Sequence, residues 1–264
     1  MKISLFQVDA FTRGPFSGNP AAVCPLIRWL PDATLQGIAL ENNLSETAFL
    51  VDRGELIDIR WFTPTVEVDL CGHATLASAF VVLECLGTRR DRVEFSSRSG
   101  PLTVDRHDEM DELLVLDFPS LPAEACDPPL RLIEGLGARP AQTLLAKSYL
   151  AVFESEAEVR TLTPDFRRLA QCHPHSVIAT APGKRHDFVS RFFAPSFGID
   201  EDPATGSAHC TLIPYWSKHL RKRRLRTYQA SRRGAELFCE DRGARVGIGG
   251  RCRLYLNGTI YVDV

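Results

Sequence analysis

Apolar and polar residues alternate in short stretches along most of this chain, a pattern that predicts β-strands. In the first half these stretches lie at 2–11, 45–51, 57–62, 92–95, 102–105 and 113–118, with an apolar stretch at 21–26. In the second half they lie at 143–153, 176–181, 187–193, 226–229, 235–239, 245–248 and 253–262. Helical spacing of apolar residues is confined to a few places, including 31–42 and 163–172. The pattern therefore predicts an α+β protein in which most elements are strands.

Two stretches break the alternation because they are apolar almost all round. They lie at 74–86 and 205–220, and each predicts a helix buried on most of its sides. A turn of small residues opens each helix, with the sequences CGHA at 71–74 and TGSA at 205–208. The same order of strand, loop, small turn and buried helix thus occurs once in each half.

This recurrence predicts two pseudo-symmetric domains, each a curved, mostly antiparallel sheet or barrel wrapped around a central helix. The expected domains are 1–118 and 126–252, and the boundary between them is expected within the proline-rich segment 119–129. The last strand, near 253–264, is expected to pack back on the first domain. A chain of 264 residues is long enough for both domains to bury a core.

Charge and cysteine usage narrow the class of protein. The formal net charge of −2 argues against general affinity for nucleic acid or an anionic membrane, and the basic run 218–226 is expected to be a solvated face. The eight cysteines are spread singly, so they are expected to be free thiols in the cytoplasm. No apolar run approaches the roughly 20 residues of a membrane span. The stretch CHPH at 172–175 is expected to be a loop, and no metal site is predicted.

The candidate functional residues lie in the two small turns, together with two acidic side chains elsewhere in the sequence. Gly72 and Gly206 would let a ligand approach the backbone at a helix start, where N–H groups and the helix dipole favour an anion. The commoner explanation of such glycines is a tight turn alone. Glu46 stands at the mouth of an apolar strand, which suits a proton carrier, although a cap partner or an exposed strand residue is the commoner case. Asp202 is a second candidate acid, or a turn residue before Pro203.

Five segments in sequence order resemble one known family. They are FSGNPAAV (16–23), NLSETAFL (43–50), FTPTVEVDLCGHATLASA (62–79), DEDPATGSAHC (200–210) and QASRRG (229–234). Together they resemble the PhzF-like family of phenazine biosynthesis, which shares the diaminopimelate-epimerase fold, over essentially the whole chain. The resemblance implies two like domains with a cleft between them, isomerase chemistry without a cofactor, and a homodimer.

The resemblance also implies a role for each matching residue. Glu46 would remove a proton from a small carboxylated substrate, such as a dihydro-hydroxyanthranilate, and return it elsewhere. The implied catalytic partners are His73, Asp202 and Ser207, and the implied substrate-binding residues are Asn19, Gly72 and Gly206.

One departure separates this chain from the related epimerases, which use two cysteines on opposite faces of the substrate carbon. Cys71 stands where one catalytic thiol would be, but Thr205 stands at the other. The broken pair favours a proton shift by a single base. An amino-acid epimerase and a non-catalytic binding protein on the same fold remain as alternatives.

Overall fold

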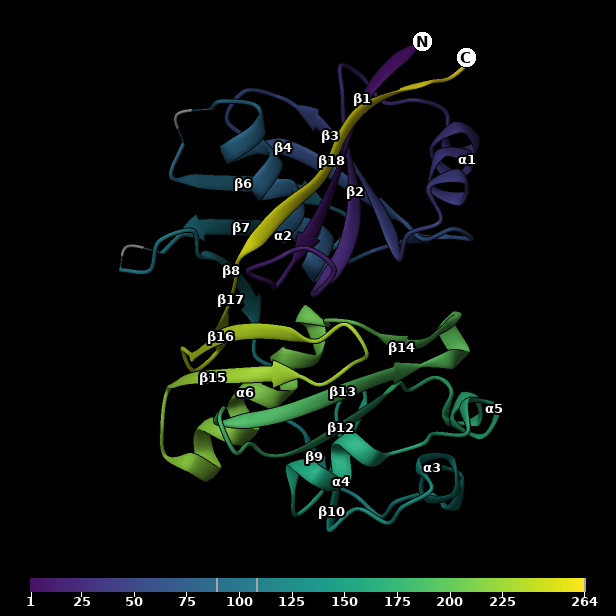
Figure 1. Ribbon diagram of the computed structural model, residues 1–264, viewed down its shortest axis with the longest axis vertical. Helices are drawn as coiled ribbons and strands as arrows, with labels where there is room; N and C mark the ends of the chain where they lie inside the picture. Colours follow the sequence, from purple (N-terminus) through teal and green to yellow (C-terminus); the bar gives the residue numbers. More distant parts are fainter. Residues whose placement is uncertain (89, 108, 264) are drawn as a thin grey trace. The chain divides into compact units, whose positions relative to one another are not determined.

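The strands and helices of the computed structural model, which describes residues 1–88, 90–107 and 109–263, fall into two units (Figure 1). The first unit comprises Met1–Asp117 together with Gly249–Val264, and the second comprises Phe118–Ile248. The sequence placed these boundaries at 118 and 252. Among the described residues, no helix has both the length and the apolar character needed to span a bilayer.

The first unit is a mixed sheet around one buried helix. Its elements are β1 (Lys2–Ala10), β2 (Asn19–Leu26), α1 (Asp32–Asn42), β3 (Glu46–Asp52), β4 (Ile57–Phe62), β5 (Glu67–Val68), α2 (Gly72–Phe80), a π-helical turn (Val81–Cys85), β6 (Arg92–Ser97), β7 (Gly100–Arg106), β8 (Leu114–Pro119) and β18 (Cys252–Tyr261). Most neighbouring strands are antiparallel, but β2–β3 and β4–β6 are parallel. The last strand, β18, pairs with β1 along its length, so the chain's end returns to the first unit.

Helix α2 occupies the interior of this unit, where it contacts β1, β2 and β3 (Figure 1). Every residue from Gly72 to Ala79 is buried. Two of them, Thr75 and Ser78, carry hydroxyl groups, which are satisfied within the helix. Thr75 Oγ1 donates to the Cys71 carbonyl at 2.5 Å, and Ser78 Oγ donates to the Ala74 carbonyl at 2.7 Å. These bonds let a sequence with hydroxyls form a helix that is buried all round.

The second unit has the same plan. Its elements are β9 (Glu124–Ala125), α3 (Leu130–Leu136), β10 (Gln142–Leu145), β11 (Tyr149–Val152), α4 (Glu156–Thr161), α5 (Phe166–Leu169), a 3₁₀ turn (Ala170–Cys172), β12 (Val177–Pro182), β13 (Phe188–Ala194), a second 3₁₀ turn (Pro195–Phe197), β14 (Ile199–Asp202), α6 (Gly206–Leu220), β15 (Arg224–Gln229), β16 (Ala235–Asp241) and β17 (Arg245–Gly250). Its central helix, α6, contacts β15 and β16.

A proline lies inside α6 without leaving a buried carbonyl unsatisfied. Pro214 has no N–H, so it cannot donate to the carbonyl of Cys210 one turn earlier. The backbone N–H of Leu121 donates to that carbonyl instead, at 2.9 Å. The segment after β8 therefore completes the hydrogen bonding of the central helix.

Three predicted elements differ from those observed. The single strand expected at 143–153 is a hairpin of β10 and β11, because the chain turns at 146–148, where the Ala146 N–H donates to the Ser148 carbonyl. The stretch 194–203, where the sequence pattern predicts neither a strand nor a helix, contains β14, which pairs with β13. The first buried helix begins at Gly72, two residues before the predicted start, so His73 lies within its first turn.

Gly18 sets the entry into β2. Its φ is +70°, and a Cβ there would lie 2.1 Å from the backbone oxygen of Ala10. The next residue, Asn19, pairs with Ala10 at the start of β2. Because the obstructing oxygen of Ala10 belongs to the backbone, it cannot move aside as a flexible side chain would.

We expect Gly18→Ala to lower the free energy of unfolding by about 3 kcal/mol or more, the sum of left-handed strain and this clash. Gly87→Ala is a matched control, because Gly87 has a φ of +67° but a Cβ there would meet no atom within 4 Å. The control should lose only about 1–2 kcal/mol. Urea denaturation measures both, and equal losses would show that the clash contributes nothing.

Candidate active site

A buried carboxylate and a buried imidazole meet at the start of α2. Glu46 is the first residue of β3, and His73 lies in the first turn of α2. His73 Nε2 and Glu46 Oε2 are 3.1 Å apart, with side chains 5% and 11% exposed. The remaining exposure belongs mostly to Glu46, so the carboxylate is the member of the pair nearer to the surface.

Two further side chains reach the other nitrogen of the ring. Asn19 Nδ2 lies 3.1 Å from His73 Nδ1, and Cys71 Sγ lies 3.5 Å from the same atom. The parallel pairing of β2 with β3 explains this convergence. Ala21 pairs with Glu46, and Asn19 precedes Ala21 by two residues. The N-terminal ends of both strands therefore lie beside the start of α2.

Protonation of this cluster is governed by burial and by the carboxylate. Burial, reinforced by Glu46, raises the pKa of the Cys71 thiol to about 11, so the thiol keeps its proton at neutral pH. Burial disfavours charge on His73, but the neighbouring Glu46 carboxylate favours it, and the pKa of the ring is raised well above its usual range. The cluster therefore favours a protonated imidazole beside the Glu46 carboxylate.

The same three residues have the donor types of a metal site, since ligand atoms of Glu46, Cys71 and His73 all lie within 4.8 Å of one another. However, the carboxylate faces Nε2 and the thiol faces Nδ1. The imidazole thus lies between the two groups, and a single cation could use only one of its nitrogens. This arrangement of carboxylate, imidazole and thiol is better suited to holding and orienting protons than to binding one metal ion.

The second unit contains its own buried polar cluster, at the start of α6. Thr205 Oγ1 donates to Asp202 Oδ2 at 2.5 Å. Gln229 holds this turn from β15, because its Oε1 accepts from the Thr205 N–H at 2.8 Å and its Nε2 donates to the Asp202 carbonyl at 2.8 Å. Thr205 Oγ1 also accepts from Gln229 Nε2 at 3.1 Å, which leaves its own proton for Asp202.

The first turn of α6 also places the other predicted residues of this unit. Gly206 is the first helical residue and is buried, whereas Ser207 is exposed. Gly72 holds the corresponding first position in α2. N–H groups in the first turn of a helix have no acceptor within the helix, so both turns offer donors suited to an anion.

The structure thus groups the predicted residues by unit. It brings Asn19, Glu46 and His73 together with Cys71, and it places Asp202 with Thr205 in the other unit. Sequence reasoning gave no role to Gln229, although it opens the QASRRG segment that carried part of the resemblance.

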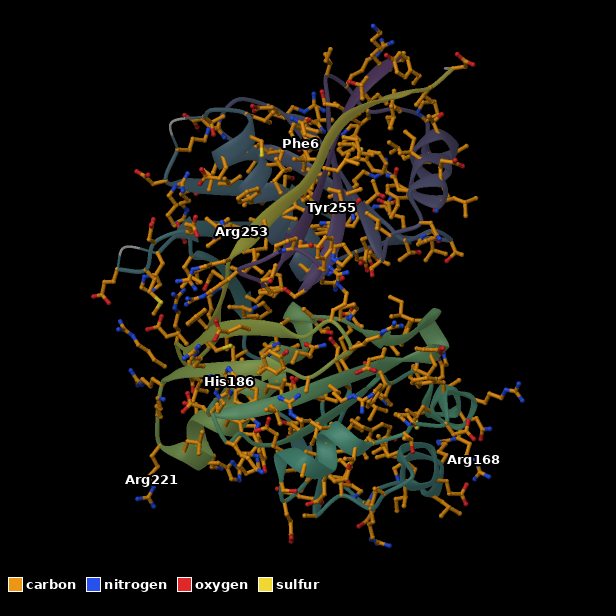
Figure 2. The ribbon with its side chains drawn as sticks, in the orientation of Figure 1. Phe6, Arg168, His186, Arg221, Arg253 and Tyr255 are labelled. Carbon is orange, nitrogen blue, oxygen red and sulfur yellow. The ribbon has the colours of Figure 1, made fainter. Side chains whose placement is uncertain are left out.

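The basic run 218–226, which begins in the last turn of α6, is partly neutralised by ion pairs. Lys222 Nζ binds Asp187 at 2.7 Å, and the guanidinium of Arg226 pairs with Glu236. Arg221 ends α6 and extends away from the ribbon (Figure 2). In the CHPH stretch, His175 Nδ1 lies 3.1 Å from the carbonyl of Lys147.

The fold alone identifies the architecture of this protein. The structure superposes on a probable proline racemase from Agrobacterium radiobacter with a TM-score of 0.64, over 99% of this chain and 93% of that one, at only 13% identity. Two units, each with a central helix and a polar cluster at its start, are therefore the diaminopimelate-epimerase-like architecture.

The chain belongs to the phenazine biosynthesis-like protein family (PhzC-PhzF), whose model matches residues 8–258. Two proteins of Pseudomonas aeruginosa, each named an uncharacterized isomerase, are 49% and 52% identical to it, over 99% and 98% of this chain and 100% and 99% of theirs. A PhzF-family protein of Enterococcus faecalis superposes with a TM-score of 0.95 at 44% identity, over 99% of this chain and 100% of that one.

Proposed function

We propose that this protein is a cofactor-independent isomerase that moves a proton on a small carboxylated substrate of the dihydroaromatic kind, with Glu46 as the proton carrier. The observation that carries the proposal is the buried Glu46–His73 pair at the start of α2. The names of the Pseudomonas relatives support the reaction class.

The chemistry needs one group that can both accept and return a proton. The Glu46 carboxylate takes a proton from one carbon of the substrate, and the electron pair of that C–H bond shifts along the conjugated system. The resulting carboxylic acid then gives the proton to another carbon, so the product is an isomer and Glu46 is regenerated. His73 stays beside the carboxylate and fixes its orientation.

Four other predicted residues bind and orient the substrate in this proposal. The first-turn N–H groups at Gly72 and Gly206 receive the substrate carboxylate. Asp202 and Ser207 bind polar substituents. The family resemblance further favours a homodimer in the cytoplasm.

An amino-acid epimerase is the second candidate, because Cys71 lies in contact with His73. Two observations disfavour it: Thr205 replaces the second thiol, and the pKa of Cys71 is raised to about 11 rather than lowered. A thiol base needs the thiolate at working pH.

We therefore expect Cys71→Ala to keep isomerase activity within about fivefold of wild type, since a neutral S–H contact contributes roughly 1 kcal/mol at most. Cys71→Ser is the control that keeps a small donor near His73. Steady-state turnover of a dihydro-hydroxyanthranilate measures both variants. Loss of turnover in Cys71→Ala with no loss of folding would restore the epimerase candidate.

A binding protein that has lost turnover is the third candidate. The predicted polar residues are all present, and Glu46 and His73 are within contact distance, which disfavours such a loss. Robust turnover of any carboxylate in a substrate screen would exclude it, and saturable binding without turnover would favour it.

A further inference from the structure

Asn19 is the most deeply buried member of the cluster around His73. The whole residue has no solvent exposure, whereas Glu46, counted as a whole residue, is 8% exposed. Its contact with the cluster is the 3.1 Å approach of Nδ2 to His73 Nδ1. A fully buried side chain that contacts the ring is poorly placed to recognise a substrate directly, in contrast to the role implied by the resemblance.

The two protonation states of His73 make opposite demands at Nδ1. In the neutral ring with its proton on Nε2, opposite Glu46, Nδ1 is an acceptor and needs a donor such as the Asn19 amide N–H. In the charged ring Nδ1 also carries a proton and needs an acceptor. The Cys71 thiol is a weak acceptor, whereas the amide oxygen of Asn19 becomes a good one if the amide turns over.

We propose that Asn19 is a positioning residue for His73: its buried amide donates to Nδ1 of the neutral ring, turns over to accept from Nδ1 of the charged ring, and so keeps Nε2 aligned on Glu46 in both states. The importance of that alignment rests on the proposed function, but the amide's effect on the ring does not. The titratable groups that the structure places against the ring are Glu46, from β3, and Cys71, just before α2.

An amide suits this position better than its nearest relatives. Aspartate offers only acceptors when ionised, so it would hold the ring in its charged state. Leucine has nearly the same shape but offers neither a donor nor an acceptor. Comparing Asn19→Asp with Asn19→Leu therefore separates the donor and acceptor functions of the amide without a large change in side-chain volume.

The test is a ¹³C and ¹⁵N NMR titration of His73 in the substrate-free, full-length protein. In Asn19→Leu we expect the protonation equilibrium of His73 to shift at least about tenfold toward the neutral ring, because the Nδ1 proton loses its acceptor. In Asn19→Asp it should shift toward the charged ring. If Asn19→Leu shifts the equilibrium toward the charged ring, or leaves it unchanged, the amide does not act as an acceptor and the proposal fails.

Kinetics then distinguish positioning from substrate contact. We expect Asn19→Leu to lower kcat about 10- to 100-fold while KM stays within about threefold. A raised KM with unchanged kcat would instead make Asn19 a substrate contact. If the leucine variant does not fold, Asn19→Asp decides alone, because an unchanged titration there overturns the contact with the ring. A protein with no isomerase activity would refute the proposed function but leave the titration result standing.

Discussion

Replacing Glu46 by Gln should lower kcat for the proton shift about 10²- to 10⁴-fold, the range that a positioned acid–base group contributes. Glutamine has almost the same shape and can still contact His73, so the fold should be retained. An amide, however, can neither take a proton from carbon nor return one. The effect is therefore expected in kcat, with a smaller change in KM.

Glu41→Gln is the matched control, because Glu41 is an exposed glutamate on α1 in the same unit. It should retain wild-type kcat. A Glu46→Gln variant that folds normally and turns over at the wild-type rate would remove Glu46 from the mechanism.

Acid should destabilise the second unit through His209. This ring is fully buried in α6, and its Nδ1 donates to the Thr205 carbonyl at 2.8 Å. Burial lowers the pKa of His209 to about 4, below the 6.5 of an unfolded chain. The stabilisation from burying the neutral ring is complete above pH 6.5 and is lost as the pH falls toward 4. The expected loss is about 3 kcal/mol.

The same helix supplies the control for this prediction. His219 makes an equivalent bond to the Tyr215 carbonyl at 2.8 Å, but its side chain is exposed. Denaturant unfolding between pH 7 and pH 4 should show a loss of stability that is about 3 kcal/mol smaller in His209→Gln than in the wild type. His219→Gln should follow the wild-type profile. Identical profiles for all three proteins would mean that His209 takes up its proton equally in the folded and unfolded states, so that its burial does not cause the acid sensitivity.

Much of the plan was predictable because it depends on local pattern. The two stretches that are apolar almost all round predicted the central helices, and the small turns that open them contain the predicted site residues His73 and Ser207. Glu46 could be singled out because it begins a strand whose residues up to Val51 are all buried.

What the sequence could not show depends on contacts between distant segments. Gln229 lies 24 residues from Thr205 and acts through its amide, which leaves no periodic signal. Asn19 and His73 are 54 residues apart, and their contact follows from the packing of α2 against β2. The strand β14 leaves no alternating pattern because its sequence, IDED, is mostly acidic, and its pairing with β13 is irregular.

The central claim is that Glu46 carries the proton, and solvent exchange tests it most directly. A dihydro-hydroxyanthranilate would be incubated in D₂O with wild-type protein or with the Glu46→Gln variant, and deuterium at the ring carbons followed by NMR. We expect deuterium incorporation with the wild type and none above the enzyme-free rate with the variant. Incorporation by the variant at the wild-type rate would contradict the account.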